Sequence, residues 1–286
     1  MPLQRAKRGL RAWWHRAALQ RNQAVFDDPV LRPILVNDPP HGLRVLRPYL
    51  IRGLDAAGRA QAVADHFGFF RRQIRESALH AIYLQGVCLT QRDTPAGQLT
   101  LMLYDSLGLG REGELRMALE LDGHTLHMFA MVVALPGTLG LPAGPSPVLW
   151  VGCNKGPGPE PDIPELIKRA TKAMQGLRPK ALMLHGAQAL AAGWGLAGLY
   201  GVANQGTVFA GYYNLRDRIK ADYDRFWQEY EGQRVTPYVY RLVGAPIAKD
   251  LAGVESSKRA AAARKIAAAQ QWFDDVVRAA MAMRVG

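Results

Sequence analysis

A change of hydrophobic period between residues 81 and 153 constrains the fold of this chain more than any other feature. Leucines alternate with other residues over 99–103, and leucine or methionine does so over 115–121, as expected for strands with one buried face. Asp122 and Gly123 follow, and an Asp-Gly pair between two strand patterns is typical of a tight hairpin turn. Strands that succeed one another this closely leave no room for crossover helices, so they must pair mostly in antiparallel fashion.

The predicted fold class is α+β, with a mostly antiparallel sheet and helical additions at both ends of the chain. Residues 1–76 form a basic region rich in helix and proline, and its segment 27–53 is expected to be extended. Residues 77–250 form the α+β core. Residues 251–286 form a C-terminal helix, which is rich in alanine and contains no glycine or proline over 255–283.

The second half of the core is expected to follow the order strand, helix, helix, strand. Helices are predicted over 162–175 and 179–192, and a buried strand follows over 199–203. Pro179 is tolerated in the first turn of the second helix, because the first N–H groups of a helix have no partner within it. A shorter helix is expected over 219–230, where aromatic residues recur with helical spacing.

Positive charge is concentrated near the N-terminus. The formal net charge is +12, and residues 1–76 hold 14 Lys and Arg against 6 Asp and Glu. Residues 1–22 contain no acidic residue, and Leu10, Trp13 and Trp14 recur with helical spacing. This pattern predicts a basic helix that binds an anionic membrane surface, in a cytoplasmic protein peripheral to the inner membrane. The alternative is a terminal helix whose tryptophans pack on the domain.

Several classes of protein and site are disfavoured. Cys88 and Cys153 show neither metal-ligand nor disulfide-framework spacing, and His124 and His127 would project to opposite faces of a strand, so no metal site is predicted. The longest apolar run, 128–135, is too short to cross a bilayer as a helix. The GxSxG and HExxH motifs are absent. Nucleic-acid binding is not expected, because no stacking platform or recognition motif accompanies the basic helices.

The helix start over 176–183, followed after the helix by a glycine and by the strand 199–202, resembles the loop-helix-strand core of GNAT-type acyltransferases. In that superfamily the loop and the helix N-terminus bind the pyrophosphate of coenzyme A. The resemblance implies a coenzyme A thioester, or a similar phosphate-bearing donor. The residues that it implies for donor binding are Gln175, Gly176, Leu177, Arg178 and Lys180. A helix start also favours anions on physical grounds, and the two cations add charge.

The chain departs from the usual GNAT loop in two respects. Pro179 removes one backbone N–H donor, and the helix predicted over 162–175 separates the loop from the preceding strand. The alternative interpretation of residues 176–183, an ordinary helix start with two solvated cations, therefore stays open.

Candidate catalytic residues follow the strand over 199–203. Asn204 is predicted to orient an amine acceptor, because an amide at a strand end lies where sheets open into crevices. One carboxylate of the next helix is predicted to take the amine proton. The other predicted site residues are Asp222, Tyr223 and Asp224, as catalytic residues, and Asn154, Lys155 and Trp227, as substrate-binding residues. The alternatives are a turn at Asn204 and core positions for the aromatic residues.

Short segments spread over roughly residues 49–270 resemble the VirK/YbjX family of bacterial proteins. They are His66-Phe67, Asp162, Ile167-Lys168, 170–172, 176–180, 201–204 and 222–227. The resemblance implies a lineage in which some members are associated with virulence, envelope integrity or tolerance of cationic peptides, and it implies no particular reaction. Two functions are therefore carried forward. One is acyl or aminoacyl transfer to a small-molecule or peptide amine, and the other is non-catalytic binding of anionic lipid or lipopolysaccharide precursors at the envelope.

Overall fold

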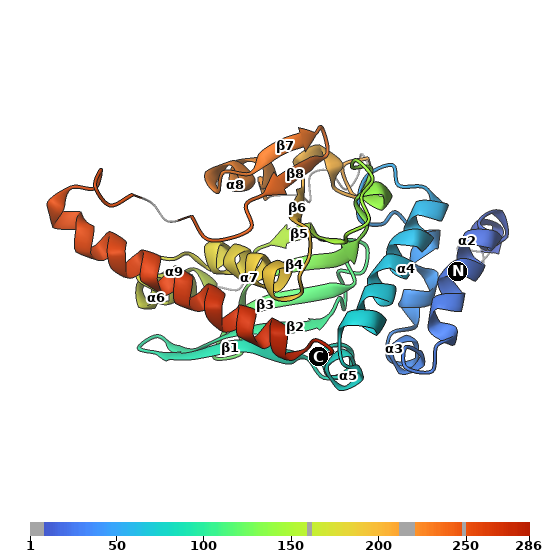
Figure 1. Ribbon diagram of the computed structural model, residues 1–286, viewed down its shortest axis with the longest axis horizontal. Helices are drawn as coiled ribbons and strands as arrows, with labels where there is room; N and C mark the ends of the chain where they lie inside the picture. Colours follow the sequence, from blue (N-terminus) through green and yellow to red (C-terminus); the bar gives the residue numbers. More distant parts are fainter. Residues whose placement is uncertain (1–8, 159–161, 212–220, 248–249) are drawn as a thin grey trace.

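The computed structural model describes residues 9–158, 162–211, 221–247 and 250–286, and an eight-stranded sheet forms its centre (Figure 1). The strand order is β1-β2-β3-β4-β5-β6-β8-β7. Neighbouring strands are antiparallel except β5 and β6, which are parallel. The strands are β1 (Val87–Thr94), β2 (Gly97–Asp105), β3 (Leu115–Leu121), β4 (His124–Ala134), β5 (Val148–Lys155), β6 (Leu199–Val202), β7 (Gln233–Thr236) and β8 (Val239–Leu242).

Helices α7 and α9 cross the sheet together, and helices α2, α3 and α4 gather at one end of the molecule (Figure 1). The α-helices are α2 (Arg16–Ala24), α3 (Arg32–Asn37), α4 (Ala56–Gln73), α5 (Glu76–Leu84), α6 (Ile163–Ala173), α7 (Pro179–Gly193), α8 (Tyr223–Glu229) and α9 (Ser256–Ala282). The 3-10 helices are η1 (Val25–Asp27), η2 (Pro39–Leu46), η3 (Pro136–Leu139) and η4 (Asn204–Gly206). None of the helices in the described part of the chain is both long and apolar enough to span a membrane.

The α+β class and the mostly antiparallel sheet predicted from the alternating pattern are confirmed. The hairpin between β3 and β4 turns at Asp122 and Gly123, whose φ angles are 49° and 80°. Positive φ at both central residues is the geometry that suits a two-residue hairpin. Helix α4 begins directly after Asp55, and Oδ1 of Asp55 caps it by accepting the N–H of Gly58 at 2.7 Å.

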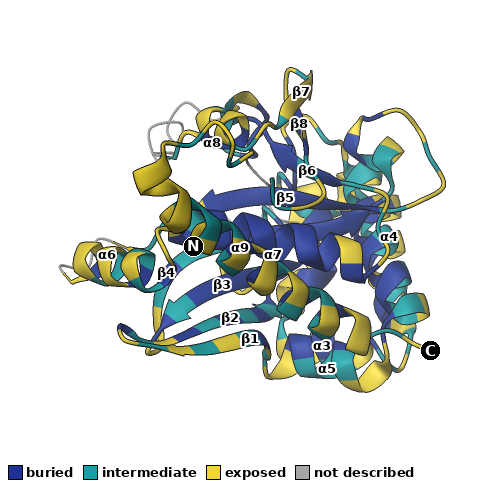
Figure 2. Cartoon of the chain, turned by 60° about the vertical axis from the view of Figure 1, so that its left-hand side comes forward, coloured by how far each residue is buried: buried dark blue, intermediate teal, exposed yellow. Residues whose placement is uncertain are grey.

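Helix α7 is buried on nearly all sides, because it lies between the sheet and α9 (Figure 2). Gly193 permits a close approach at the end of α7, since a Cβ atom there would lie 2.6 Å from the Cβ of Ala280. Trp272 of α9 is 0% exposed and donates from Nε1 to the carbonyl oxygen of Leu182 at 3.1 Å. The second half of α9 is therefore docked on the core, and its first half is mostly exposed.

The segment 27–53 is not extended, and this prediction is wrong. It contains the short helices α3 and η2, and η1 ends at its first residue. Pro33 lies in the first turn of α3, and Pro39 and Pro40 begin η2. Because proline lacks only an N–H that a first helical turn leaves without a helical partner, these prolines start helices here.

The N-terminal region divides into a docked part and an exposed part. Asn22 of α2 is 0% exposed and donates from Nδ2 to the carbonyl oxygen of His41 at 2.9 Å. Residues 9–14 are helical, but Trp13 and Trp14 are 61% and 74% exposed. The alternative in which the tryptophans pack on the domain is therefore wrong. Because α2 carries the buried Asn22, a deletion that removes the exposed basic residues without disturbing the core must end before α2.

The three predicted regions share one apolar core. The same buried cluster contains Phe67 from residues 1–76, Leu101 from the central region, and Trp272 from the C-terminal helix. Residues 1–76 and the C-terminal helix thus complete the core that the sheet begins.

Candidate functional site

The parallel strands β5 and β6 are paired over only part of their length. They pair only as far as Val151 and Gly201, whereas β5 continues to Lys155. Beyond the pairing, the N–H of Asn154 donates to the hydroxyl oxygen of Tyr223 at 3.3 Å. Helix α8 begins at Tyr223, so the start of α8 places this hydroxyl at the opening between the strands. Openings at the carboxyl ends of parallel strands are common positions for ligands.

Gly152 forms a β-bulge just before this opening. Its neighbours, Val151 and Cys153, pair with successive residues of β4, so Gly152 is the extra residue. A Cβ atom at Gly152 would overlap the carbonyl oxygen of Glu112. Glycine is therefore required for the loop before β3 to lie this close to β5, and a bulge next to a site is a common way to direct side chains toward it.

Three side chains form a line beyond the paired residues. The carboxylate of Glu112 lies close enough to the thiol of Cys153 to affect its pKa, and the hydroxyl of Tyr223 donates to Sγ of Cys153 at 3.9 Å. Burial raises the pKa of Glu112 to about 6. Burial also raises the pKa of the Cys153 thiol and of the Tyr223 hydroxyl. Near neutral pH, the line therefore has a carboxylate at one end, a phenol at the other, and a thiol between them.

His127 of β4 extends this line on the far side of Asn154. Its Nε2 lies 2.6 Å from Oδ1 of Asn154. Burial lowers the pKa of His127 to about 4, so the ring is neutral at pH 7. We assign the ring proton to Nε2, which then donates to the amide oxygen of Asn154. Asn154 therefore connects His127, through its side chain, with Tyr223, through its backbone N–H.

A pocket of about 450 Å³ opens beside His127, between β4, α6 and the start of α7. Its lining includes the cations Lys168, Lys172, Arg178 and Lys180, and we call it the lysine pocket. Nζ of Lys180 lies 2.8 Å from Oε2 of Glu229, whereas Arg178 is exposed at the helix start. No carboxylate is among the described residues that line this pocket, so its charge suits an anionic ligand.

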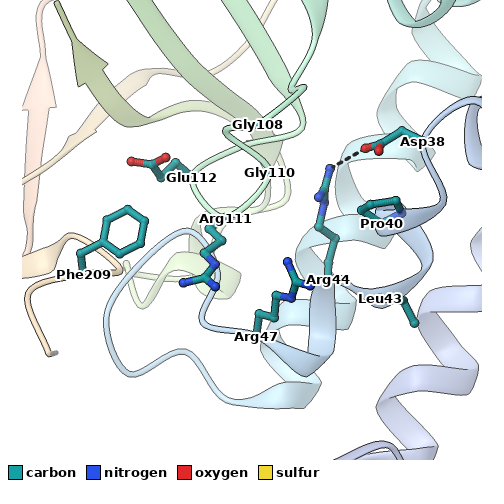
Figure 3. A pocket seen from close by; sticks show the side chains of 10 residues that line it. All are labelled: Asp38, Pro40, Leu43, Arg44, Arg47, Gly108, Gly110, Arg111, Glu112 and Phe209. Atoms are coloured by element: carbon teal, nitrogen blue, oxygen red, sulfur yellow. Dashed lines mark ion pairs between the residues drawn. The ribbon is translucent and has the colours of Figure 1, made fainter. Parts of the chain in front are cut away.

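A second pocket, of about 290 Å³, lies on the Glu112 side of the opening (Figure 3). Its lining includes Arg44, Arg47 and Arg111, and we call it the arginine pocket. Figure 3 shows Asp38 and Arg44 on one side of this pocket, and Glu112 with Phe209 on the other. Glu112 both lines the arginine pocket and contacts Cys153, so it joins this pocket to the opening between the strands.

A buried ion-pair network includes Arg44 and Asp38 of the arginine pocket and extends behind them. Oε2 of Glu114 lies 2.6 Å from Nδ1 of His41, and Oε1 of Glu114 accepts from Nε of Arg44 at 3.1 Å. Nε2 of His41 lies 3.0 Å from Oδ1 of Asp105, and the hydroxyl of Tyr49 donates to Glu114. The network ties η2 and the chain after it to the loop that precedes β3.

The charges in this network control one another. Burial by itself would lower the pKa of His41, but the carboxylates of Glu114 and Asp105 outweigh it and raise this pKa to about 9. Burial would raise the pKa of Glu114, but Arg44 and His41 hold it far below its ordinary value. His41, Arg44 and Glu114 are therefore all charged at pH 7.

One group of side chains in the described part of the chain has the spacing of metal ligands. The ligand atoms of Asp38, His41 and Asp105 lie within 4.8 Å of one another. However, the guanidinium of Arg44 lies 3.5 Å from Asp38 and already supplies positive charge at this position. We therefore interpret the group as part of the ion-pair network.

Comparison with protein families matches residues 3–281 to the family described as "Protein of unknown function (DUF535)". The chain belongs to the DUF535 family. It is 26% identical over 238 residues to "Uncharacterized protein YbjX" of Escherichia coli K12, and the alignment covers 81% of this chain and 69% of YbjX. It is also 39% identical over 79 residues to an uncharacterized protein of Haemophilus influenzae, with 27% of this chain and 26% of that protein covered. The resemblance to the VirK/YbjX family is confirmed, and no solved structure matches the chain.

In this DUF535 protein, Asn204 joins the end of β6 to the start of α8. Its Nδ2 donates to Asp222 at 2.9 Å, and its Oδ1 accepts the N–H of Tyr223 at 2.8 Å. Asp222 also caps α8, and Asp224 accepts the N–H of Asn204 at 2.8 Å and pairs with Arg234 at 2.9 Å. These contacts hold Tyr223 in place, and the catalytic roles predicted for Asn204, Asp222 and Asp224 stay predictions.

The five residues predicted to bind the donor separate into two groups. Gln175 and Gly176 have φ angles of 55° and 84° and terminate α6, and Leu177 is 4% exposed. Arg178 and Lys180 line the lysine pocket. Arg178 and Lys180 therefore lie where they could contact a donor. Gln175, Gly176 and Leu177 instead form the turn between α6 and α7.

The three residues predicted to bind substrate also lie in different surroundings. Asn154 is 5% exposed and belongs to the hydrogen-bonded line described above. Lys155 is exposed at the end of β5. Trp227 is 0% exposed and donates from Nε1 to the carbonyl oxygen of Val202 at 2.8 Å, so it lies in the core, away from any surface that a substrate could reach.

Sequence patterns did not single out Glu112, Arg111 or Arg44 as site residues in this DUF535 chain. Glu112 and Arg111 lie between Gly110 and Gly113, in a short loop without a regular pattern. A Cβ atom at Gly113 would lie 2.5 Å from the backbone nitrogen of Met131, so the loop needs glycine at this position. Glycines around charged residues were thus the available signal, and the signal is weak.

Proposed function

We propose that this DUF535 protein transfers an acyl or aminoacyl group from a phosphate-bearing donor of the coenzyme A type to an amine. The observation that carries the proposal is the position of the Tyr223 hydroxyl beyond the last paired residues of β5 and β6, where its neighbours lead to Glu112 of one pocket and to His127 of the other. We also propose a GNAT-like core. The order β4-β5-β6-β8-β7, with α7 between the parallel strands β5 and β6, supports it.

The lysine pocket is the proposed donor site. Lys172 and Arg178 of its lining can pair with phosphate oxygens, whereas Lys168 and Lys180 also have the carboxylates of Glu165 and Glu229 nearby. Charged groups on both partners make such hydrogen bonds stronger than neutral ones. Backbone donors at the start of α7 contribute little, since Pro179 has no N–H and the N–H of Ala181 donates to the carbonyl oxygen of Arg178. Binding of the donor phosphates therefore depends mainly on the side chains of α6 and α7.

Tyr223 is the proposed proton donor. A thioester donor supplies an activated acyl carbon and a thiol as the leaving group. Because burial raises its pKa, the Tyr223 hydroxyl keeps its proton at neutral pH and is available to give it to a sulfur atom in the opening. Its contacts with Asn154 and Cys153 fix the direction of the hydroxyl, and the bonds of Asn204 fix the helix that carries it.

Calorimetric titration with coenzyme A tests the donor site. The parent chain should bind coenzyme A. The double variant Lys172→Gln/Arg178→Gln should bind it about tenfold or more weakly, because each lost charge-assisted hydrogen bond is worth at least 1 kcal/mol. The matched control is Arg264→Gln/Lys265→Gln, which removes the same charge from an exposed turn of α9. Absence of binding by the parent chain, or equal binding by both variants, would contradict the proposed donor site.

A Tyr223→Phe variant separates binding from chemistry. Phenylalanine keeps the ring packed but removes the proton. We expect unchanged affinity for coenzyme A and turnover lower by roughly 10²-fold or more, within the range for a lost general acid. Turnover is followed as thiol release from acetyl-coenzyme A in the presence of an amine. Full turnover by Tyr223→Phe would show that the hydroxyl does not donate the proton.

A second candidate function is binding to an anionic membrane surface through residues 9–14. The exposure of Trp13 and Trp14 favours it, because two large aromatic side chains on a helix with basic neighbours suit a lipid headgroup region. We propose that this helix attaches the protein to the surface while the core acts on its substrates, so the two functions are compatible.

Vesicle flotation tests the membrane function. The full chain should bind anionic vesicles at low salt and be released at high salt, because exposed charges are screened within about 8 Å at physiological ionic strength. Deletion of residues 1–14 should abolish binding and leave the thermal transition unchanged, since α2 and its buried Asn22 are retained. Equal binding by the deleted chain would refute this function.

A further inference from the structure

The arginine pocket is a second charged cavity, separate from the proposed donor site. Its described lining holds three arginines and two carboxylates, so the lining is net positive. It lies on the Glu112 side of the opening between β5 and β6, and the lysine pocket lies beside His127. A line of neighbouring side chains runs from Glu112 of one pocket through Cys153, Tyr223 and Asn154 to His127 of the other.

The inner wall of this pocket is rigid. Arg44 is 8% exposed, and Nη2 of Arg44 donates to the hydroxyl of Ser106 at 2.9 Å while Nε donates to Glu114. A Cβ atom at Gly110 would overlap the guanidinium of Arg44, so the loop before β3 is pressed directly on it. This packing fixes the position of one positive group before any ligand arrives, and preorganised groups lose less entropy on binding.

The outer wall carries the more accessible cations. The guanidinium of Arg111 lies 5.8 Å from the ring centre of Phe209, and Arg47 is exposed. Figure 3 shows the side chains of Arg47 and Arg111 between the Asp38 side and the Glu112 side of the pocket. An anionic group held between these arginines would therefore lie in the same pocket as the Glu112 carboxylate.

We infer that the arginine pocket is the acceptor site, and that it takes an amine that also carries a carboxylate or a phosphate group. This inference rests on the proposed acyl transfer. The arginines bind the anionic group, because guanidinium matches carboxylate and phosphate oxygens in two-point geometry. The Glu112 carboxylate attracts the amine at the other end of the acceptor.

Glu112 and Tyr223 supply the two proton transfers that acyl transfer requires. The amine nitrogen forms a bond to the acyl carbon, and the bond from this carbon to the donor sulfur breaks. One proton passes from the nitrogen to the Glu112 carboxylate, and one passes from the Tyr223 hydroxyl to the sulfur. Glu112 then releases its proton to water and Tyr223 takes one back from water, which restores both residues; Cys153 lies near Glu112 and accepts from the Tyr223 hydroxyl. The net products are an amide and a free thiol.

Calorimetric titration of the full chain with four small molecules tests the acceptor chemistry. O-phosphoethanolamine carries a phosphate and an amine, glutamate carries carboxylates and an amine, ethanolamine lacks an anionic group, and methyl phosphate lacks an amine. We expect binding of at least one of the first two compounds, and which of them binds identifies the anionic group. Ethanolamine and methyl phosphate should each bind at least about tenfold more weakly, because each lacks one of the two charged contacts. Binding of ethanolamine equal to that of the first two, or binding of none of the four, would overturn the inference.

Two variants locate the site. Arg111→Gln should weaken binding of the best compound by about tenfold or more, whereas Arg264→Gln, on the exposed face of α9, should leave it unchanged. Glu112→Gln should keep the affinity for methyl phosphate and weaken binding of the amine compound. A folded Arg111→Gln protein with unchanged affinity would place the acceptor elsewhere, and the thermal transition of each variant shows whether it is folded.

Failure of the acceptor site and failure of the proposed function give different results. If coenzyme A binds and depends on Lys172 and Arg178 but none of the four compounds binds, the acceptor assignment is wrong and the donor site stands. If the compounds bind through Arg111 and coenzyme A does not bind, the donor proposal is wrong and the arginine pocket remains a site for an anionic amine.

Discussion

Replacing Glu114 by glutamine keeps the shape of the side chain and removes the negative charge at the centre of the ion-pair network. Glu114 is 0% exposed and faces His41, Arg44 and Tyr49. The variant leaves two cations in a buried position with one carboxylate fewer. Removal of one partner from a buried pair usually costs about 3–5 kcal/mol.

The pKa of His41 provides an independent magnitude. The difference between its folded value of about 9 and its ordinary value of 6.5 corresponds to about 3 kcal/mol. Because the folded value is the higher one, folding favours the protonated ring. This contribution is fully present below pH 6.5 and is lost as the pH rises through about 9. Both arguments predict that Glu114→Gln lowers the free energy of unfolding by about 3 kcal/mol or more at pH 6.

Urea denaturation followed by tryptophan fluorescence measures this loss at pH 6 and again at pH 9.5. We expect a large difference between the parent chain and Glu114→Gln at pH 6 and a smaller one at pH 9.5, where His41 has lost much of its charge in the parent chain. Glu120→Gln in β3, the strand that follows Glu114, is the matched control, because Glu120 is only partly buried and should change stability by about 0.5 kcal/mol or less. A loss below about 1 kcal/mol at pH 6 would refute the reasoning, since it would show that these charges do not stabilise one another.

Three further outcomes are expected. Turnover of the parent chain should rise with pH through about 6, as Glu112 loses its proton, and Glu112→Gln should lack this rise in a pH-rate profile. Gly152→Ala should lower the free energy of unfolding by about 1–3 kcal/mol and weaken acceptor binding, whereas Gly156→Ala, where a Cβ atom has nothing within 4 Å, should change neither in denaturation and calorimetry. Asn204→Ala should reduce turnover by displacing Tyr223 while coenzyme A binding persists; unchanged turnover would show that α8 is held without it.

The candidate site was only partly predictable. Asn154 is predicted because it follows a strand, and Tyr223 because Asp222 and Asp224 flank it on a helix, and both are local patterns. The approach of Glu112 to Gly152 and Cys153 depends on a loop that reaches β5 only in the folded chain. Trp227 was expected near substrate, but helical spacing shows which residues share a face and does not show whether that face meets solvent or Gly201 of the sheet.

The sequence by itself determined the elements whose cause is local. Alternation of leucine with other residues over 99–103 specifies a strand with one buried face, Asp122 with Gly123 specifies a tight turn, and the alanine-rich run after Ser256 specifies a long helix. Only the tertiary structure decided how these elements meet. The insertion of β8 between β6 and β7 and the line from Glu112 to Tyr223 arise from contacts between residues distant in the chain. Periodicity reports which face of an element is buried, and the partner that buries it is chosen by packing over the whole molecule.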